Sequence, residues 1–193
     1  KLVINAVPFL VWLYFNKYLQ EKEHNMKMRH AKNEDLDKIM KIIDETVKEM
    51  NENGNFQWDE SYPNREVFIN DIKEGTLYAA VNDRDEVIGI SVANFDSFEE
   101  YDNLEWKSQK SDYVIHRLAV DNVYRNEGVA AFLMENIEKE IIKKGKCYMR
   151  TDTNSKNIKA QRFFEKVGYK FVGEIKVPRL KDTFFCYEKR LCD

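Results

Sequence analysis

The sequence has few cysteines, glycines and prolines, and no close cysteine pairs of the kind that hold a metal. Of its 193 residues, three are cysteine, seven glycine and three proline. Cys147, Cys186 and Cys192 lack the spacing of a zinc or redox motif, and their odd number argues against a disulfide framework. We therefore expect reduced cysteines, no metal site, and a cytoplasmic protein.

Neither sign of charge dominates the sequence. Its 31 Lys and Arg residues against 34 Asp and Glu residues give a formal net charge of −3. This balance excludes a general attraction to nucleic acid or to anionic membranes, so we expect neither as a partner. With 43% hydrophobic and 34% charged residues, a chain of this length is typical of a globular protein with one domain.

A long hydrophobic run is also missing. The most apolar stretch, Leu2–Phe15, is shorter than the roughly 20 residues that a membrane-spanning helix needs. It lacks the basic start and the small-residue cleavage site of a signal peptide. We divide the chain into an N-terminal extension, residues 1–25, and a domain, residues 26–193, with a natural start near Met26. Alternatively, the extension is a helix that packs on the domain or on a second copy, which would give a homodimer.

Strand-like and helix-like patterns alternate through the domain, without repeats or low-complexity linkers. A helix is predicted from an N-cap at Asn33 to a stop at Gly54, because apolar residues recur between them at helical spacing. Further helices are predicted over residues 64–73, 128–144 and 158–167, and strands over 28–32, 76–82, 87–95, 113–120, 147–153, 169–175 and 183–191. The fold class is α/β (α+β), a mostly antiparallel sheet with helical crossovers.

The most informative segment runs from His116 to Ala130, where a strand leads through a turn into a strongly amphipathic helix. A helix N-terminus offers unpaired N–H groups and the positive end of a dipole, which together favour a phosphate. Gly128 lets the backbone approach such an anion closely, and Arg125 adds a charge that can form paired hydrogen bonds to phosphate oxygens. The segment fits neither the lysine-bearing P-loop nor the three-glycine dinucleotide motif.

From Met26 to Leu191 the chain resembles the GNAT (GCN5-related) N-acetyltransferase superfamily. The segment from Arg125 to Ala130 is similar to the family's acyl-CoA pyrophosphate loop. The segment from Asn157 to Tyr169 is similar to its second signature. The resemblance implies a sheet splayed in the middle, with acetyl-CoA in the opening and its pantetheine arm paired with a bulged strand. The implied cofactor residues are Leu118, Ala119, Val120, Arg125, Asn126, Gly128, Val129, Ala130, Asn157 and Phe164.

The sequence departs from the family at both acid–base positions. A tyrosine that protonates the leaving thiolate in many relatives corresponds to Phe164, and a carboxylate base of some relatives corresponds to Val114. His116 is the nearest substitute base, because strict alternation puts it on the same face of the strand as Val114. Tyr187 is a second candidate acid. The alternative interpretation of both residues is structural packing in the sheet.

An aromatic and acidic run, residues 56–63, lies between the first two predicted helices, the region that shapes the acceptor pocket in this family. Trp58 and Tyr62 are candidate contacts for an amine, with negative charge from Asp59 or Glu60. Trp106 and its acidic neighbours are candidates for the opposite wall. The alternative is an aromatic loop folded onto the core.

The resemblance implies an N-acetyltransferase. Acetyl-CoA would be the acyl-donor cosubstrate, and the acetyl group would pass directly to a primary amine within a ternary complex. A small-molecule amine and a peptide amine remain open as acceptors. Because the usual acid and base are missing, a CoA-binding module with little or no transferase activity is the alternative. An interaction role driven by the apolar N-terminus is a third.

Overall fold

The computed structural model describes residues 26–109, 111–178 and 182–192. The predictions about residues 1–25 lie outside this part of the chain. Within it, seven strands form one sheet in the order β1-β2-β3-β4-β5-β7-β6. All neighbouring strands are antiparallel except β4 and β5, which are parallel. The predicted mixed, mostly antiparallel sheet flanked by helices is confirmed.

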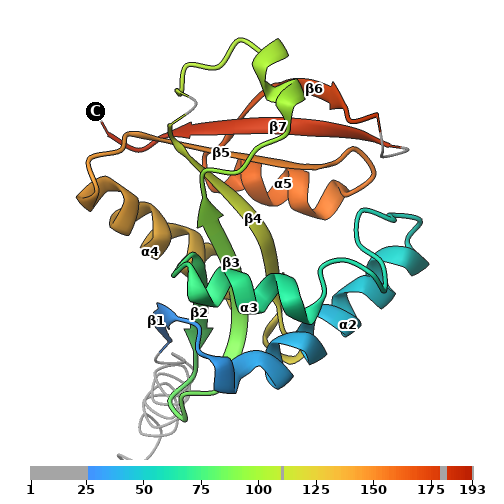
Figure 1. Ribbon diagram of the computed structural model, residues 1–193, viewed down its shortest axis with the longest axis vertical. Helices are drawn as coiled ribbons and strands as arrows, with labels where there is room; N and C mark the ends of the chain where they lie inside the picture. The colour runs from blue at the N-terminus through green and yellow to red at the C-terminus, as the bar shows by residue number, and fades with distance from the viewer. Residues whose placement is uncertain (1–25, 110, 179–181, 193) are drawn as a thin grey trace, which may run out of the picture.

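Strands and helices lie close to their predicted positions (Figure 1). The strands are β1 (Lys27–His30), β2 (Leu77–Val81), β3 (Val87–Asn94), β4 (Tyr113–Val120), β5 (Tyr148–Asn154), β6 (Lys170–Lys176) and β7 (Thr183–Arg190). The helices are α2 (Leu36–Glu52), α3 (Arg65–Lys73), α4 (Val129–Lys143) and α5 (Ile158–Lys166), with short 3-10 helices η1 (Asn33–Asp35), η2 (Glu99–Asn103) and η3 (Asn122–Tyr124).

The predicted N-cap at Asn33 is wrong. Asn33 begins the short helix η1, and α2 starts only at Leu36. The carboxylate of Asp35 accepts a hydrogen bond from the backbone N–H of Lys32 at 2.8 Å and one from Arg29 Nη2 at 3.0 Å. This local network explains the extra turn, because it satisfies a donor at the chain's entry into the helix.

Residues of the sheet alternate between two apolar layers. On β2, Leu77, Ala79 and Val81 pack in a core with residues of α2 and α3, and this side is called the front face. Tyr78 and Ala80 pack in a second core with residues of α4 and α5, on the back face. A third cluster on the front face joins η2 to β4, β6 and β7.

The sheet opens between β4 and β5, the one parallel pair among the described strands. β4 and β5 are paired only from Tyr113↔Met149 to Ile115↔Thr151, and the Thr151 hydroxyl donates to Ile115 O at 3.1 Å where the pairing ends. Beyond this point β5 and β7 fan away from β3 and β4 (Figure 1). The register of β4 against β3 shifts between His116 and Ala119, and Arg117 has φ +50°, so a β-bulge lies at the opening.

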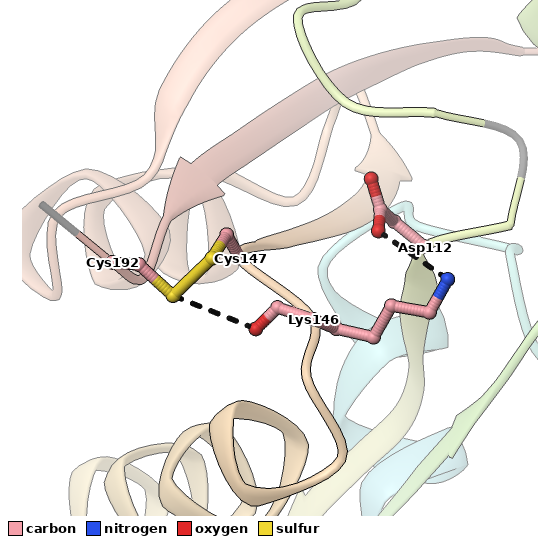
Figure 2. The surroundings of a disulfide bond; sticks show 4 residues. All are labelled: Asp112, Lys146, Cys147 and Cys192. Carbon is pink, nitrogen blue, oxygen red and sulfur yellow. Dashed lines mark hydrogen bonds and ion pairs between the residues drawn. A yellow bond between two sulfur atoms is a disulfide. The ribbon is translucent and has the colours of Figure 1, made fainter.

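A disulfide joins Cys147 to Cys192, which corrects the expectation of three reduced cysteines (Figure 2). The two residues are 45 positions apart in sequence, but β5 begins where its neighbour β7 ends, and Leu191 N donates to Cys147 O at 2.8 Å. Strand pairing therefore creates the proximity, with 5.0 Å between the two Cα atoms. The cysteines no longer support a cytoplasmic location.

Reduction of this disulfide is expected to lower the free energy of unfolding by about 2–4 kcal/mol, because the crosslink restricts the unfolded chain. The measurement is thermal unfolding with and without dithiothreitol. A Cys192→Ser variant is the control, and its melting temperature should not respond to the reductant. A thiol titration of the denatured, unreduced protein should find one free thiol, Cys186. Three free thiols would contradict the crosslink.

Candidate active site

The turn from β4 into α4 has the shape that the sequence predicts for an anion site. Gly128 is the N-cap of the 15-residue helix α4 and has φ +85°, a left-handed conformation that favours glycine. The first helical hydrogen bond at this end runs from Phe132 N to Gly128 O at 2.9 Å, so the N–H groups of residues 129–131 have no partner within the helix. A Cβ on Gly128 would meet nothing within 4 Å, so the space beside this residue of the turn is open.

An ion cluster lies across the opening of the sheet. The carboxylate of Glu49, near the C-terminus of α2, pairs with Arg125 of the β4–α4 turn and with Lys159 of α5. The hydrogen bond from Lys159, with a further one from Arg125, holds the pKa of Glu49 below its usual value. One carboxylate thus holds two cations that come from opposite sides of the opening. Both cations are of the type that binds phosphate groups.

The predicted cofactor residues of β4 place their side chains in the core. Ala119 is buried on the front face, and Leu118 and Val120 pack against the back-face core. Their side chains are thus committed to packing. A ligand at this strand would have to pair with the main chain, as the resemblance implies.

Asn157 and Phe164, the predicted cofactor residues of the second signature, both have structural roles in α5. The Asn157 side chain accepts a hydrogen bond from Ala160 N at 3.2 Å and so caps the helix. Phe164 is buried in the back-face core, with its ring centroid 6.0 Å from that of Tyr187. Their contact with a cofactor remains a prediction.

Tyr187 lies on β7 at the level where β4 and β5 part. It pairs with Thr151, the last residue of β5 that is in register with β4. Its ring is buried on the back face, and burial raises the pKa of its hydroxyl. The hydroxyl therefore stays protonated at neutral pH, as a proton donor must.

His116 lies on the front face beside the opening, opposite Val92 of β3. Its Nε2 is 3.1 Å from Asp96 O, and since a carbonyl only accepts, Nε2 carries the hydrogen. Burial and the nearby Arg117 charge lower the pKa of His116 to about 4. The ring is therefore neutral at physiological pH and a weak base.

The connection between α2 and α3 contacts both strands that border the opening. The hydroxyl of Tyr62 accepts from Arg117 Nη1 of β4 at 2.8 Å, and Gln57 Oε1 accepts from Asn154 N of β5 at 3.1 Å. Tyr62 is exposed, whereas Trp58 is 7% exposed and packs in the front-face core. For Trp58 the structure favours the alternative interpretation, a loop folded onto the core.

Sequence reasoning missed the charged pair that holds the bulge. Arg117 donates from Nη2 to Asp71 Oδ1 at 2.8 Å and from Nε to Asp71 Oδ2 at 3.1 Å. This bidentate salt bridge connects β4 to α3. The two side chains are 11% and 6% exposed. No signal in the sequence marks the pair, because its two members are 46 positions apart and meet only through the bulge.

Trp106, predicted for the opposite wall, packs over η2 instead of standing free. Its Nε1 donates to Tyr101 O at 2.8 Å, and its ring centroid lies 4.8 Å from that of Tyr101. The guanidinium of Arg150 lies 5.3 Å from the Trp106 ring. The segment with η2 and Trp106 thus covers the front face next to β5. Within it, Tyr101 rather than Trp106 lies toward the opening.

Comparison with known proteins assigns the chain to the acetyltransferases. The model of the acetyltransferase (GNAT) family matches residues 39–169, so the protein belongs to that family. A GNAT family acetyltransferase from Streptococcus agalactiae is 27% identical, with a TM-score of 0.72 over 86% of this chain and 95% of that one. Ard1 from Thermoplasma volcanium, at 14% identity, shares the fold with a TM-score of 0.66 over 87% of this chain and 99% of that one. No curated protein matches.

Membrane-spanning helices and clusters of metal ligands are both absent from the described part of the chain. Between residues 26 and 192, leaving out the undescribed positions, no helix has both the length and the apolar character to cross a membrane. Over the same ranges, no group of three or more His, Cys, Asp or Glu side chains is arranged to hold a metal ion.

Proposed function

We propose that the protein transfers the acetyl group of acetyl-CoA to a primary amine by direct transfer in a ternary complex. The family assignment supports an acyltransferase, and the turn at Gly128 supports a CoA-type donor. The observation that carries the proposal is the left-handed Gly128 at the N-terminus of α4, the helix that follows β4, which is the strand that parts from β5. A diphosphate would accept hydrogen bonds from the N–H groups of residues 129–131.

The side chains around the opening suggest separate roles on its two faces. On the back face, the ring of Tyr187 packs beside that of Phe164, so its protonated hydroxyl is the candidate to replace the tyrosine that the sequence lacks there. On the front face, His116 and Tyr62 border the opening from β4 and from the α2–α3 connection. The acceptor amine would enter from this face, opposite the helices α4 and α5.

The test of cofactor binding is a thermal shift. Acetyl-CoA at about 100 times its dissociation constant should stabilise the protein by about 2.7 kcal/mol, because it binds only the folded state. For a chain of 193 residues this corresponds to a rise in melting temperature of about 5–10 °C. Desulfo-CoA should give nearly the same shift. An unchanged melting temperature at saturating acetyl-CoA would remove the proposal.

The test of transfer is the release of free thiol from acetyl-CoA in the presence of a panel of amines. The panel holds an alkylamine, a polyamine, and a peptide with a free N-terminus and one lysine. An amine-dependent release supports the transferase. A protein that binds acetyl-CoA but releases no thiol with any amine would be the CoA-binding module of the alternative interpretation.

A further inference from the structure

Asp152 is the first residue of β5 beyond its pairing with β4. The last pair is Ile115↔Thr151, and Asp152 continues on β5 opposite Cys186 of β7. Alternation along β5 puts the Asp152 side chain on the face of Arg150, and Arg150 pairs with Val114 of β4. His116 is the next β4 residue on the face of Val114. Asp152 and His116 therefore border the opening on the same, front face.

Among the described residues, only one oxygen of the Asp152 carboxylate accepts a hydrogen bond. Tyr101, which is 1% exposed, donates its hydroxyl to Asp152 Oδ2 at 2.8 Å. Within the described residues Oδ1 has no hydrogen-bond partner, and the residue is only partly buried. One oxygen is thus anchored by a rigid aromatic side chain, while the other is available to a ligand in the opening.

The surroundings make this carboxylate more basic than an ordinary aspartate. Burial raises the pKa of Asp152 to about 6, although the Tyr101 hydrogen bond opposes the rise. The titratable and charged groups around it are Tyr101 of η2, Cys186 of β7, Arg150 of β5 and His116 of β4. Burial keeps the Cys186 thiol and the Tyr101 hydroxyl protonated, because it raises the pKa of each.

Asp152 is better suited than His116 to accept a proton near neutral pH. The imidazole of His116 uses Nε2 on Asp96 O, and its pKa is lowered to about 4. A general base works best when its pKa lies near the working pH, and an anionic carboxylate also attracts an ammonium group. A pKa of about 6 leaves Asp152 ionised at neutral pH.

We infer that Asp152 is the proton acceptor of the transfer: its carboxylate binds the ammonium group of the acceptor and removes one proton from it. This assignment rests on the proposed function. An ammonium group carries three protons on nitrogen, and the amide product keeps one. The first passes to Asp152, and the freed lone pair forms the C–N bond with the thioester carbonyl carbon. The C–S bond then breaks, and the second proton leaves with the sulfur as thiol. Asp152 returns its proton to water.

The first test is Asp152→Asn, which keeps the size of the side chain and an acceptor for the Tyr101 hydroxyl. With the amine that gives the fastest thiol release, kcat/KM at about pH 7 should fall by roughly a hundredfold or more. Because the variant needs amine that is already neutral, its rate should rise about tenfold per pH unit toward the pKa of the amine. Glu174→Gln, an equal charge change at an exposed position of β6, is the control and should behave like the parent.

Tyr101→Phe tests the positioning contact. It removes the hydrogen bond that lowers the pKa of Asp152, so the acidic limb of the kcat/KM profile should move to higher pH than in the parent. At high pH the rate should recover. A rate that is lowered equally at every pH would indicate a structural role and would count against the inference.

A third measurement needs no acceptor. Because the folded-state pKa of Asp152 lies above its unfolded-state value, its contribution to stability is present at low pH and is lost as the pH rises through about 6. Asp152→Asn does not titrate. The melting temperature of the variant minus that of the parent should therefore be more positive at about pH 7.5 than at about pH 4.5. An equal difference at both pH values would show that folding does not raise the pKa of Asp152, and it would count against the inference.

The outcomes separate the inference from the proposed function. If the parent releases thiol with an amine and Asp152→Asn is equally active across the pH range, the inference alone fails. If His116→Ala shows the larger loss and the steeper pH dependence, the histidine is the base and the inference fails. A parent that binds acetyl-CoA but acetylates none of the amines overturns both the proposed function and the role of Asp152.

Discussion

Gly128→Val is expected to weaken acetyl-CoA binding by about a hundredfold or more while leaving the protein folded. The valine side chain would fill the open space beside Gly128, next to the N–H groups of residues 129–131 that we propose as the diphosphate site. Losing two hydrogen bonds to a charged group costs about 3–6 kcal/mol. A valine at φ +85° also strains the backbone by about 1–2 kcal/mol. Isothermal titration with acetyl-CoA measures the loss, and circular dichroism checks the fold.

Gly145→Val is the control that separates the effect of backbone strain on stability from the steric effect on diphosphate binding. Gly145 follows the other end of α4 and has φ +77°, and a Cβ there would meet nothing within 4 Å, so a valine at this position meets a similar strain. Its melting temperature should fall like that of Gly128→Val, but acetyl-CoA should bind as in the parent. If both valine variants bind like the parent, the turn at Gly128 is not the diphosphate site.

The ion cluster adds a test that depends on salt. Arg125→Glu reverses a charge beside the turn and should weaken acetyl-CoA binding, with a deficit that shrinks at high salt. Glu49→Gln should strengthen acetyl-CoA binding instead, since it releases Arg125 and Lys159 from their carboxylate partner. We expect about two- to fivefold tighter binding at low salt. The steric deficit of Gly128→Val should not respond to salt.

The elements of the fold could be predicted because each one has a local signal. Apolar residues at helical spacing define α4, and the helices predicted from residues 64 and 158 begin within one residue of the observed starts of α3 and α5. The turn at Gly128 was predicted from the same kind of signal, a glycine between a strand and an amphipathic helix. These features depend on neighbouring residues in the sequence.

The features that the sequence did not show depend on register and on contacts between distant segments. The resemblance implies a bulged strand, but the residue pattern does not place the bulge at Arg117, because strict alternation is the only rule that a sequence offers for a strand. Asp152 lies among other polar residues of β5, and the sequence does not distinguish it from them. Its place at the opening follows from where the β4–β5 pairing ends. The Cys147–Cys192 bond likewise follows from the pairing of β5 with β7.

Removing one partner of the Arg117–Asp71 pair is expected to lower the free energy of unfolding more than any other change proposed above. Asp71→Ala leaves the Arg117 guanidinium buried on the front face, with Tyr62 as its remaining hydrogen-bond partner. An unpaired buried charge costs about 3–5 kcal/mol. Burial raises the pKa of Asp71 in spite of the adjacent guanidinium, whereas the pKa of Arg117 is raised although burial opposes the rise, through Tyr62 and Asp71. The two shifts act in opposite directions on stability. We expect a small net contribution from the intact pair because the desolvation of two buried charges offsets their attraction.

A double variant, Asp71→Ala with Arg117→Ala, should therefore be more stable than Asp71→Ala alone, because it removes the orphaned charge. Urea unfolding of the parent, both single variants and the double variant gives the coupling energy. The bulge provides a second readout. If the pair holds the β4 main chain in position for the cofactor, the double variant should remain folded but bind acetyl-CoA more weakly than the parent. A double variant with parental affinity would show that the pair only stabilises α3 against the sheet. A single Asp71→Ala variant as stable as the parent would contradict the buried contact itself.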